Sequence, residues 1–310
     1  MPIKYIHSVF VSNDSRLRAG WRLIIQILLT LLFLIPLQLL GAWIGGRNIQ
    51  ILTWGVAITL SVWVTGWIMD KRPIRDFGLK LDMQWWRDCA VGFFMAALVM
   101  SLVVLCQWLM GWIEFTGFGW NRSSDQHYMI ILSGYLVTMA MVGFYEELWM
   151  RGYQLKNLSE GFFFANNQFA AVCVAVAISS LIFGALHLGN PHATVFGAIV
   201  IVLAGVMLAL PYVLTGQLGM SVGIHFAWNF IQGGVYGFPV SGMRFRQSIL
   251  QFEHTGPASW TGGSFGPEGG LLGIFGVMAL LIAVLVWHRI KGSGLKISAS
   301  LLSPPLSGNS

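Results

Sequence analysis

Residues 143–151 read GFYEELWMR, and this stretch places two adjacent carboxylates, Glu146 and Glu147, and the cation Arg151 at the end of an apolar run that begins near Met129. An ionisable side chain at membrane depth is costly, tends to face the protein interior and marks a functional site. Glu147 and Arg151 are four residues apart with the acid first, the favourable order for a helical ion pair. Glu146 lies about 100° further round the helix and is therefore available for another role.

The composition indicates a polytopic membrane protein. The chain has 310 residues, of which 56% are hydrophobic and only 10% are charged, with a mean hydropathy of +0.70. Soluble domains carry about 25% charged residues. The net charge of +6 comes from bases beside apolar spans, where topology signals and lipid headgroups account for them, so nucleic acid is not an expected partner but membrane lipid is. Cys89, Cys106 and Cys173 lie in apolar spans without CxxC spacing, which predicts core residues and neither a disulfide framework nor a zinc site.

Apolar runs suited to membrane-spanning helices predict an all-α transmembrane bundle of about eight spans. They lie at 22–43, 49–69, 89–112, 128–150, 167–188, 193–214, 218–238 and 270–288. We therefore expect a cytoplasmic juxtamembrane segment at 1–20, one transmembrane domain at 21–291, and a disordered tail at 292–310 that is rich in Ser, Pro and Gly.

The positions of the basic residues predict the orientation. With the N-terminus inside, fourteen Lys and Arg residues fall in inner segments and four in outer loops, which predicts that both termini are cytoplasmic. The longest outer loop, 239–269, carries Glu253, His254 and Glu268 among Gly, Ser and Pro. We expect a solvated surface there, because an acid and a histidine in a Gly-rich loop are weak evidence for a metal site.

Two further clusters lie within predicted spans. Phe183 and His187 are four residues apart at the end of the fifth span, and His225 and Asn229 share one helix face inside the seventh. The small residues Gly219, Gly223 and Ala227 recur every four positions on roughly the opposite face, where they allow close helix packing. The seventh helix is therefore expected to pack with one side and to present His225 and Asn229 on the other.

Each of these residues also has a structural interpretation. The Glu147–Arg151 pair can tie its helix in place, His225 can make an interhelical hydrogen bond, His187 can cap a helix end, and Phe183 can simply pack. Together, however, they match the needs of amide hydrolysis, which requires a base to activate water and donors to stabilise the oxyanion. A carboxylate with a histidine supplies the base, and a second histidine with an asparagine amide supplies the donors. Alternatively, the same Glu and His residues can hold a divalent metal that acidifies water.

The three clusters, in this order and on successive predicted helices, resemble the EExxxR, FxxxH and HxxxN motifs of the CPBP family, which comprises the type II CAAX prenyl proteases and the bacterial Abi proteins. The likeness covers about residues 128–240. The stretch RPIRDFGL at 72–79 also resembles a basic segment of bacterial members, which favours a bacterial inner membrane as the location.

The resemblance implies a membrane-embedded endopeptidase that acts on a peptide or a membrane protein. Glu146 and His187 would activate the attacking water, and His225 and Asn229 would form the oxyanion site. Glu147, Arg151 and Phe183 would support them. The family is described both as metal-dependent and as glutamate-type. The chain has no HExxH, which excludes a zincin-type site, and we expect metal-independent catalysis. A divalent metal, if present, would be held by Glu146, His187 and His225.

Two rival functions come from other classes. A non-catalytic immunity or scaffold protein would bind a partner and tolerate the loss of Glu146. A small transporter would also explain charged residues inside the membrane, but it would be expected to show repeated halves or broken helices in matching positions, and the sequence shows neither.

Overall fold

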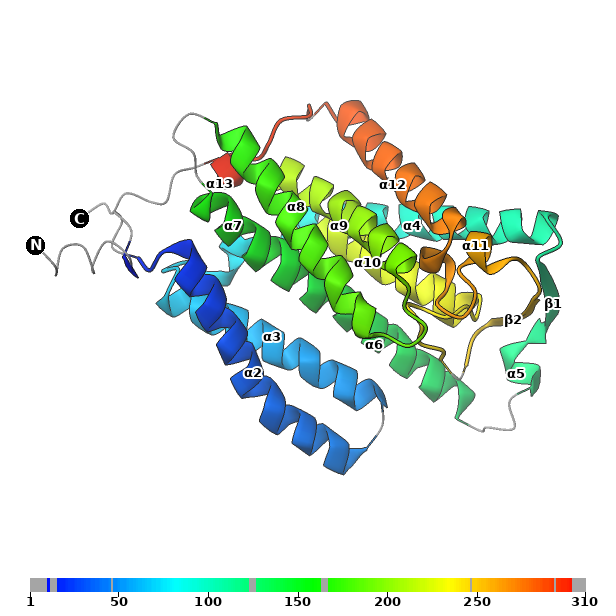
Figure 1. Ribbon diagram of the computed structural model, residues 1–310. Helices are drawn as coiled ribbons and strands as arrows, with labels where there is room; N and C mark the ends of the chain where they lie inside the picture. Colours follow the sequence, from blue (N-terminus) through cyan, green and yellow to red (C-terminus); the bar gives the residue numbers. More distant parts are fainter. Residues whose placement is uncertain are drawn as a thin grey trace, which may run out of the picture.

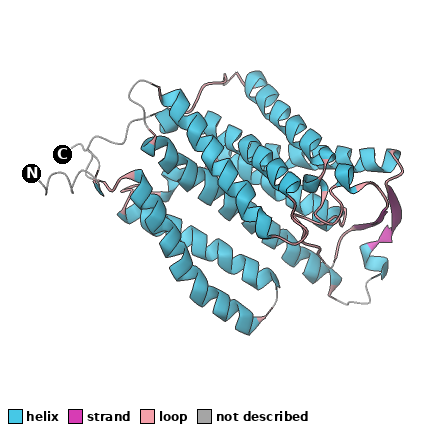
Figure 2. Cartoon of the chain, in the orientation of Figure 1, coloured by secondary structure: helices cyan, strands magenta, loops and turns pink. Residues whose placement is uncertain are grey.

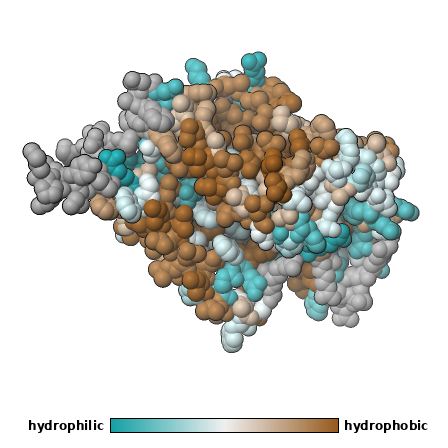
Figure 3. All heavy atoms as spheres, viewed as in Figure 1, coloured by the Kyte–Doolittle hydropathy of each residue, from teal (hydrophilic) through white to brown (hydrophobic). Residues whose placement is uncertain are grey.

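The computed structural model describes residues 10–11, 16–45, 47–122, 127–162, 167–245, 247–292 and 294–302 (Figure 1). It is an all-α bundle, as predicted, and helices make up most of the described chain (Figure 2). Within the described part of the chain, seven helical segments are long and apolar enough to span a membrane. They are α2 (Ala19–Ile44), α3 (Arg47–Ile68), α4 (Met83–Leu109), the segment Tyr128–Gly161, α8 (Gln168–Leu186), α9 (Val195–Thr215) and α12 (Leu271–Ile290). Apolar side chains cover the flank of the bundle in Figure 3, as expected for an integral membrane protein.

The predicted seventh span, 218–238, is a shorter and central helix. It consists of α10 (Gly219–Phe230) followed by the π-helical turn η4 (Ile231–Val235), which together rise about 25 Å. Nearly every side chain of α10 is buried, and Figure 1 shows the helix among its neighbours in the middle of the bundle. A helix that is enclosed by protein needs neither the length nor the uniform apolarity of one that faces lipid. Of the eight predicted spans, seven correspond to long helices of the described chain, and the remaining one corresponds to the shorter central helix α10.

The small-residue face of α10 packs as the sequence predicts. A Cβ atom on Gly223 would lie 2.0 Å from the carbonyl oxygen of Cys89, and one on Gly219 would lie 2.3 Å from that of Trp85. Both neighbours belong to α4, so only glycine allows the two backbones to approach this closely. This contact fixes the rotation of α10 and turns His225 and Asn229 away from α4.

The segment that carries the two glutamates is one long helix with a change of winding. It begins as α6 (Tyr128–Glu147), continues as the π-helix η2 (Leu148–Leu155) and ends as α7 (Lys156–Gly161). The fourth predicted span, 128–150, therefore runs eleven residues further, to Gly161. π-helical turns are rare and frequently occur at functional sites. Two of the three motif-bearing segments have one: α6 changes to π winding after Glu147, with Arg151 inside η2, and α10 changes two residues after Asn229.

Polar connections close the two ends of the bundle. They include the short helices η1 (Ile74–Phe77), α5 (Gly119–Arg122), η3 (His187–Gly189), α11 (Ala258–Thr261), η5 (Pro267–Gly269) and α13 (Ala299–Leu302). The strands β1 (Ile113–Phe118) and β2 (Leu250–His254) pair antiparallel. In the loop 239–269, Glu253 and His254 at the end of β2 are exposed, as predicted. Glu268 differs from the prediction, because it is buried and holds this part of the loop against the bundle.

The C-terminal segment also differs from the prediction. Within the expected disordered tail, residues 294–302 include α13, whose Leu301 is buried in the main core, and the Ser298 N–H donates to the carbonyl of Val213 at 2.8 Å. Residues 303–310 lie outside the described residues. The expected juxtamembrane segment 1–20 is described only at 10–11 and from Arg16 onward.

Candidate active site

The site forms where α6 crosses α10. A Cβ atom on Gly143 would lie 2.9 Å from the backbone nitrogen of Phe226, so the two helices touch at that point. One turn further along α6 come Glu146 and Glu147, and the neighbour of Phe226 is His225. The close crossing therefore brings the first and third motifs together.

Glu147 is the buried centre of an ion-pair network. Its Oε1 accepts a hydrogen bond from Nη1 of Arg151 at 3.0 Å and another from Nδ1 of His225 at 2.8 Å. The side chains of Glu147 and Arg151 are 0% and 1% exposed. The second Arg151 nitrogen, Nη2, donates to the carbonyl of Gly205 at 3.1 Å. The predicted ion pair is confirmed, and because Glu147 also binds His225, the network connects the first motif to the third.

Glu146 faces the other way, into a cavity. Its side chain is 20% exposed, and its Oε2 lies 3.7 Å from Nε2 of His225, too far for a direct hydrogen bond. This Oε2 is buried and has no hydrogen-bond partner among the described residues. Because a buried carboxylate oxygen without a partner is unfavourable, the geometry leaves Glu146 ready to accept a proton from a molecule in the cavity.

His187 has a defined tautomer. Helix α8 tightens at its end, where the His187 N–H bonds to the carbonyls of Gly184 and Ala185. The carbonyl of Phe183 is thereby left for the imidazole, and Nδ1 lies 2.8 Å from it. Since a carbonyl can only accept, Nδ1 carries the proton, and in the neutral ring Nε2 keeps its lone pair. His187 can therefore act as a base through Nε2.

Phe183 is the common neighbour of the charged groups. The guanidinium of Arg151 lies 4.5 Å above the centre of its ring, in a cation–π contact. The rings of His187 and His225 lie 4.8 Å and 6.1 Å from it, both edge-on. Phe183 therefore holds both imidazole rings in place by packing against them. The packing and the supporting role that the sequence suggested for Phe183 are thus one and the same.

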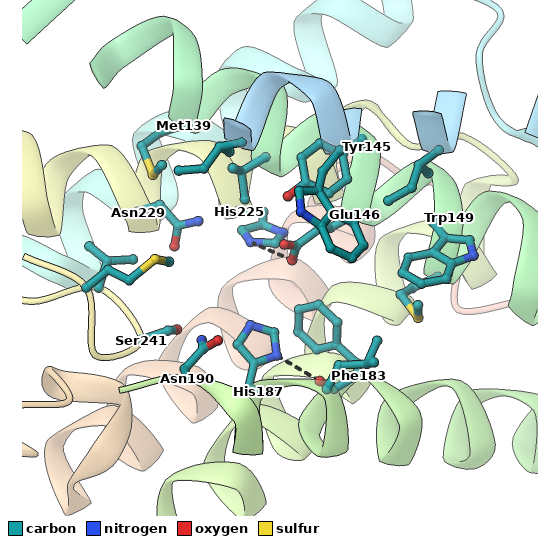
Figure 4. Close-up of a pocket in the computed structure, with 18 of the residues that line it drawn as sticks. Met139, Tyr145, Glu146, Trp149, Phe183, His187, Asn190, His225, Asn229 and Ser241 are labelled. Atoms are coloured by element: carbon teal, nitrogen blue, oxygen red, sulfur yellow. Dashed lines mark hydrogen bonds and ion pairs between the residues drawn. The ribbon is translucent and has the colours of Figure 1, made fainter. Parts of the chain in front are cut away.

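Glu146, His187, His225 and Asn229 all line one cavity of about 520 Å³ (Figure 4). They come from α6, the end of α8 and α10. The backbone carbonyl of Asn229 accepts a hydrogen bond from the hydroxyl of Tyr135 at 3.0 Å, which holds this turn of α10 against α6. The three sequence motifs thus converge on one chamber that is large enough for an extended peptide segment.

Two polar residues of the cavity were not singled out from the sequence. Asn190 follows the η3 turn, and Ser241 lies in a tight turn with a φ of 46°. The buried Glu268 accepts hydrogen bonds from the backbone N–H of Ser241 and, at 3.1 Å, from its hydroxyl. A smaller cavity of about 60 Å³ adjoins the first and is lined by Ser241, Glu268 and His187 among others.

The opposite wall of the large cavity is apolar and comes from the first two helices of the bundle. The side chains that form it are those of Ile27 and Leu31 on α2, and Ile51, Trp54 and Ile58 on α3. The sequence motifs give no indication of this wall, because α2 and α3 are distant in sequence and carry no recognisable pattern beyond hydrophobicity. The cavity thus has one reactive polar side and one apolar side.

The side chains as they stand do not make a three-ligand metal site. Among the described residues, no group of three His, Cys, Asp or Glu side chains is arranged to hold a metal ion. His225 uses Nδ1 for Glu147, so only its Nε2 and the Glu146 carboxylate face each other. The set Glu146, His187 and His225 would have to draw closer together to bind a metal.

Comparison with known proteins agrees with this geometry. Residues 128–231 match the family model described as "Type II CAAX prenyl endopeptidase Rce1-like". The matched region begins with α6 and ends two residues after Asn229, so it contains all three motifs. No curated protein and no solved structure matches the chain.

Proposed function

We propose that this chain, whose residues 128–231 belong to the type II CAAX prenyl endopeptidase Rce1-like family, is an intramembrane endopeptidase in which Glu146 and His187 activate water. The observation that carries the proposal is the free Glu146 Oε2, which faces a cavity that also presents His187, His225 and Asn229. A scaffold would need the Glu147 network, but it would have no use for an unpartnered carboxylate oxygen beside two histidines.

In the proposed reaction, the Glu146 carboxylate accepts a proton from water as the water oxygen attacks the carbonyl carbon of the scissile amide. Nε2 of His187 holds the water through its lone pair. A base in this position contributes roughly 10²–10⁴-fold to the rate. The products are a free carboxylate and an amine, and the amine nitrogen takes its proton from Glu146 as the C–N bond breaks.

His225 and Asn229 stabilise the oxyanion that forms in between. In the protonated imidazole both nitrogens donate, Nδ1 to Glu147 and Nε2 toward the cavity. The side-chain amide of Asn229, one helical turn further along α10, supplies a second donor. Loss of one such donor costs about 2.7–4 kcal/mol of transition-state stabilisation in other hydrolases.

The proposal is tested by mapping new protein N-termini in membranes of cells that produce the wild-type chain or Glu146→Gln. Glutamine keeps the size of the side chain but cannot take the proton. We expect a set of N-termini that appear with the wild type and disappear with Glu146→Gln. Glu253→Gln, at an exposed carboxylate on β2, is the matched control and should leave the set unchanged. If the wild type and Glu146→Gln give the same N-termini, the non-catalytic scaffold function replaces the peptidase.

A further inference from the structure

The two ends of the bundle can be told apart by their contacts. At one end, called the terminal end here, Nη1 of Arg16 donates to the carbonyl of Asp70, and Leu218 N–H donates to the carbonyl of Gly78. The residues 294–302 pack at the same end through Ser298. The terminal end thus comprises Arg16, 69–82, 216–218 and 294–302, and both described ends of the chain lie there (Figure 1).

The opposite end, called the distal end, is built from the connections 187–194 and 236–270 and from the two strands. The N–H of Gly242 donates to the carbonyl of Phe265 at 2.7 Å, and a Cβ atom on Gly242 would lie 1.8 Å from the carbonyl oxygen of Pro191. The turn at 240–243 therefore packs between Pro191, which follows α8, and Phe265, which precedes α12. Glu268 fastens the same turn through Ser241.

The cavity reaches the distal end. Besides the residues of the helices and His187, the described residues that line it are Asn190, Val240, Ser241, Met243 and Phe245, and all five lie at the distal end. None of the described lining residues comes from the terminal end. Asn190, Ser241 and Met243 are half-buried and form a partly exposed rim at this end. The more exposed lining residues Leu31, Trp54 and Leu186 also open the flank of the cavity, between α2, α3 and α8, toward lipid. Figure 4 shows Asn190 and Ser241 beside His187, next to the reactive groups.

Toward the terminal end the bundle is filled by a buried polar network. Gln26, which is 0% exposed, accepts hydrogen bonds from Nε1 of Trp149 and Nε2 of Gln154, both at 2.9 Å. Below it, Arg22 pairs with Asp70 and, at 2.9 Å, with Glu160.

Tyr153 completes this network by donating to Asp70 at 2.9 Å. These side chains satisfy one another in the interior, so they close the route from the cavity to the terminal end.

The positive-inside rule assigns a side of the membrane to each end. Of the 18 Lys and Arg residues, Arg151 lies beside the candidate active site and belongs to neither end of the bundle, so it does not bear on the orientation. By sequence position, Arg47, Arg122, Arg244 and Arg246 belong to distal segments, and the remaining thirteen belong to the terminal end. This asymmetry places the terminal end in the cytoplasm. The rim of the cavity then faces the extracytoplasmic side.

We propose that the active site opens to the extracytoplasmic side and that its substrate is a polypeptide segment presented there, either exported or part of a membrane protein. The inference rests on the proposed peptidase function. The apolar wall of α2 and α3 accommodates apolar side chains of the segment, while Ser241 and Asn190 bind its backbone. The C-terminal tail of a cytosolic protein would meet the closed end of the bundle.

The accessibility of single cysteines to a membrane-impermeant maleimide tests the sidedness. The three free native cysteines, Cys89, Cys106 and Cys173, are first replaced by alanine. Ser241→Cys at the rim and Glu253→Cys on the distal surface are expected to react in intact cells. Ser298→Cys, at the terminal end, is expected to react only after permeabilisation.

The reverse labelling pattern would overturn the orientation. Labelling of Glu253→Cys without any labelling of Ser241→Cys would instead show that the cavity does not open at the distal end. Neither result depends on catalysis, so failure here is distinguishable from failure of the peptidase proposal.

The substrate side is tested with the Glu146-dependent N-termini. We expect them to map to extracytoplasmic parts of exported or membrane proteins. N-termini in cytoplasmic segments, or cleavage next to C-terminal cysteines of cytosolic proteins, would overturn the inference while leaving the peptidase intact. If no N-termini depend on Glu146, both the peptidase proposal and the substrate proposal fail. The cysteine labelling would still show on which side of the membrane the cavity opens.

Discussion

Replacement of Glu147 by glutamine is expected to lower the free energy of unfolding by about 3–5 kcal/mol, because it breaks a buried ion pair from one side. In the structure Arg151 is 1% exposed, and its contacts among the described residues include the Glu147 carboxylate, the Gly205 carbonyl and the face of the Phe183 ring. Glutamine keeps an acceptor oxygen for Arg151, but it removes the negative charge that neutralises the buried guanidinium. The loss corresponds to roughly two to three and a half orders of magnitude in the unfolding equilibrium.

The measurement is reversible unfolding by SDS in mixed micelles, followed by the fluorescence of the 14 tryptophans. Arg151→Met and the double variant Glu147→Gln/Arg151→Met complete a double-mutant cycle. Since the double variant contains no uncompensated charge, we expect it to be more stable than Glu147→Gln, with a coupling energy of about 0.5–3 kcal/mol. If Glu147→Gln stays within about 0.5 kcal/mol of the wild type, as an ordinary surface substitution would, the structural role of Glu147 is refuted.

Three further results are expected. Gly223→Val should lose folded protein on size-exclusion chromatography in detergent, because its Cβ would lie 2.0 Å from the carbonyl of Cys89, whereas Gly20→Ala, with nothing within 4 Å, should be neutral. Glu268→Ala should lower the free energy of unfolding by about 1–3 kcal/mol, since it leaves the backbone N–H of Ser241 without an acceptor. Burial raises the pKa of Glu268 above its ordinary 4.5, so its contribution to stability is present at low pH and is lost as the pH rises through the folded-state pKa. Glu268→Gln should flatten that part of the pH profile, and an unchanged profile would contradict the assignment.

The sequence predicts the reactive half of the site because its residues follow helical spacing. Glu147 and Arg151 are one turn apart, and so are Phe183 and His187, and these short-range relations survive folding. The small residues on α10 also predict which face packs, and therefore which face carries His225. Convergence of the motifs follows because polar side chains inside a membrane protein have nowhere favourable to point except toward one another.

The other half of the site was not predictable, because long-range contacts make it. Ser241 and Glu268 sit in a Gly-rich loop whose composition indicates solvent exposure. Contacts with distant parts of the chain bury this region: Gly242 packs against Pro191, and Gln232 donates to Glu268. The residues of the apolar wall on α2 and α3 have the same sequence pattern as residues that face lipid, so the sequence does not distinguish them. The number of spans was uncertain for a related reason, since a central helix such as α10 is surrounded by protein and escapes the length rule for lipid-facing helices.

The most direct measurement is the cleavage rate of purified, folded protein in lipid bilayers, with a membrane protein identified from the Glu146-dependent N-termini as substrate. Wild type, Glu146→Gln and the control Glu253→Gln are compared with and without a chelator, which separates metal-dependent from metal-independent water activation. We expect Glu146→Gln to be slower by at least ~100-fold while Glu253→Gln equals the wild type. A Glu146→Gln protein that is folded and cleaves at the wild-type rate would contradict the assignment of Glu146 as the base.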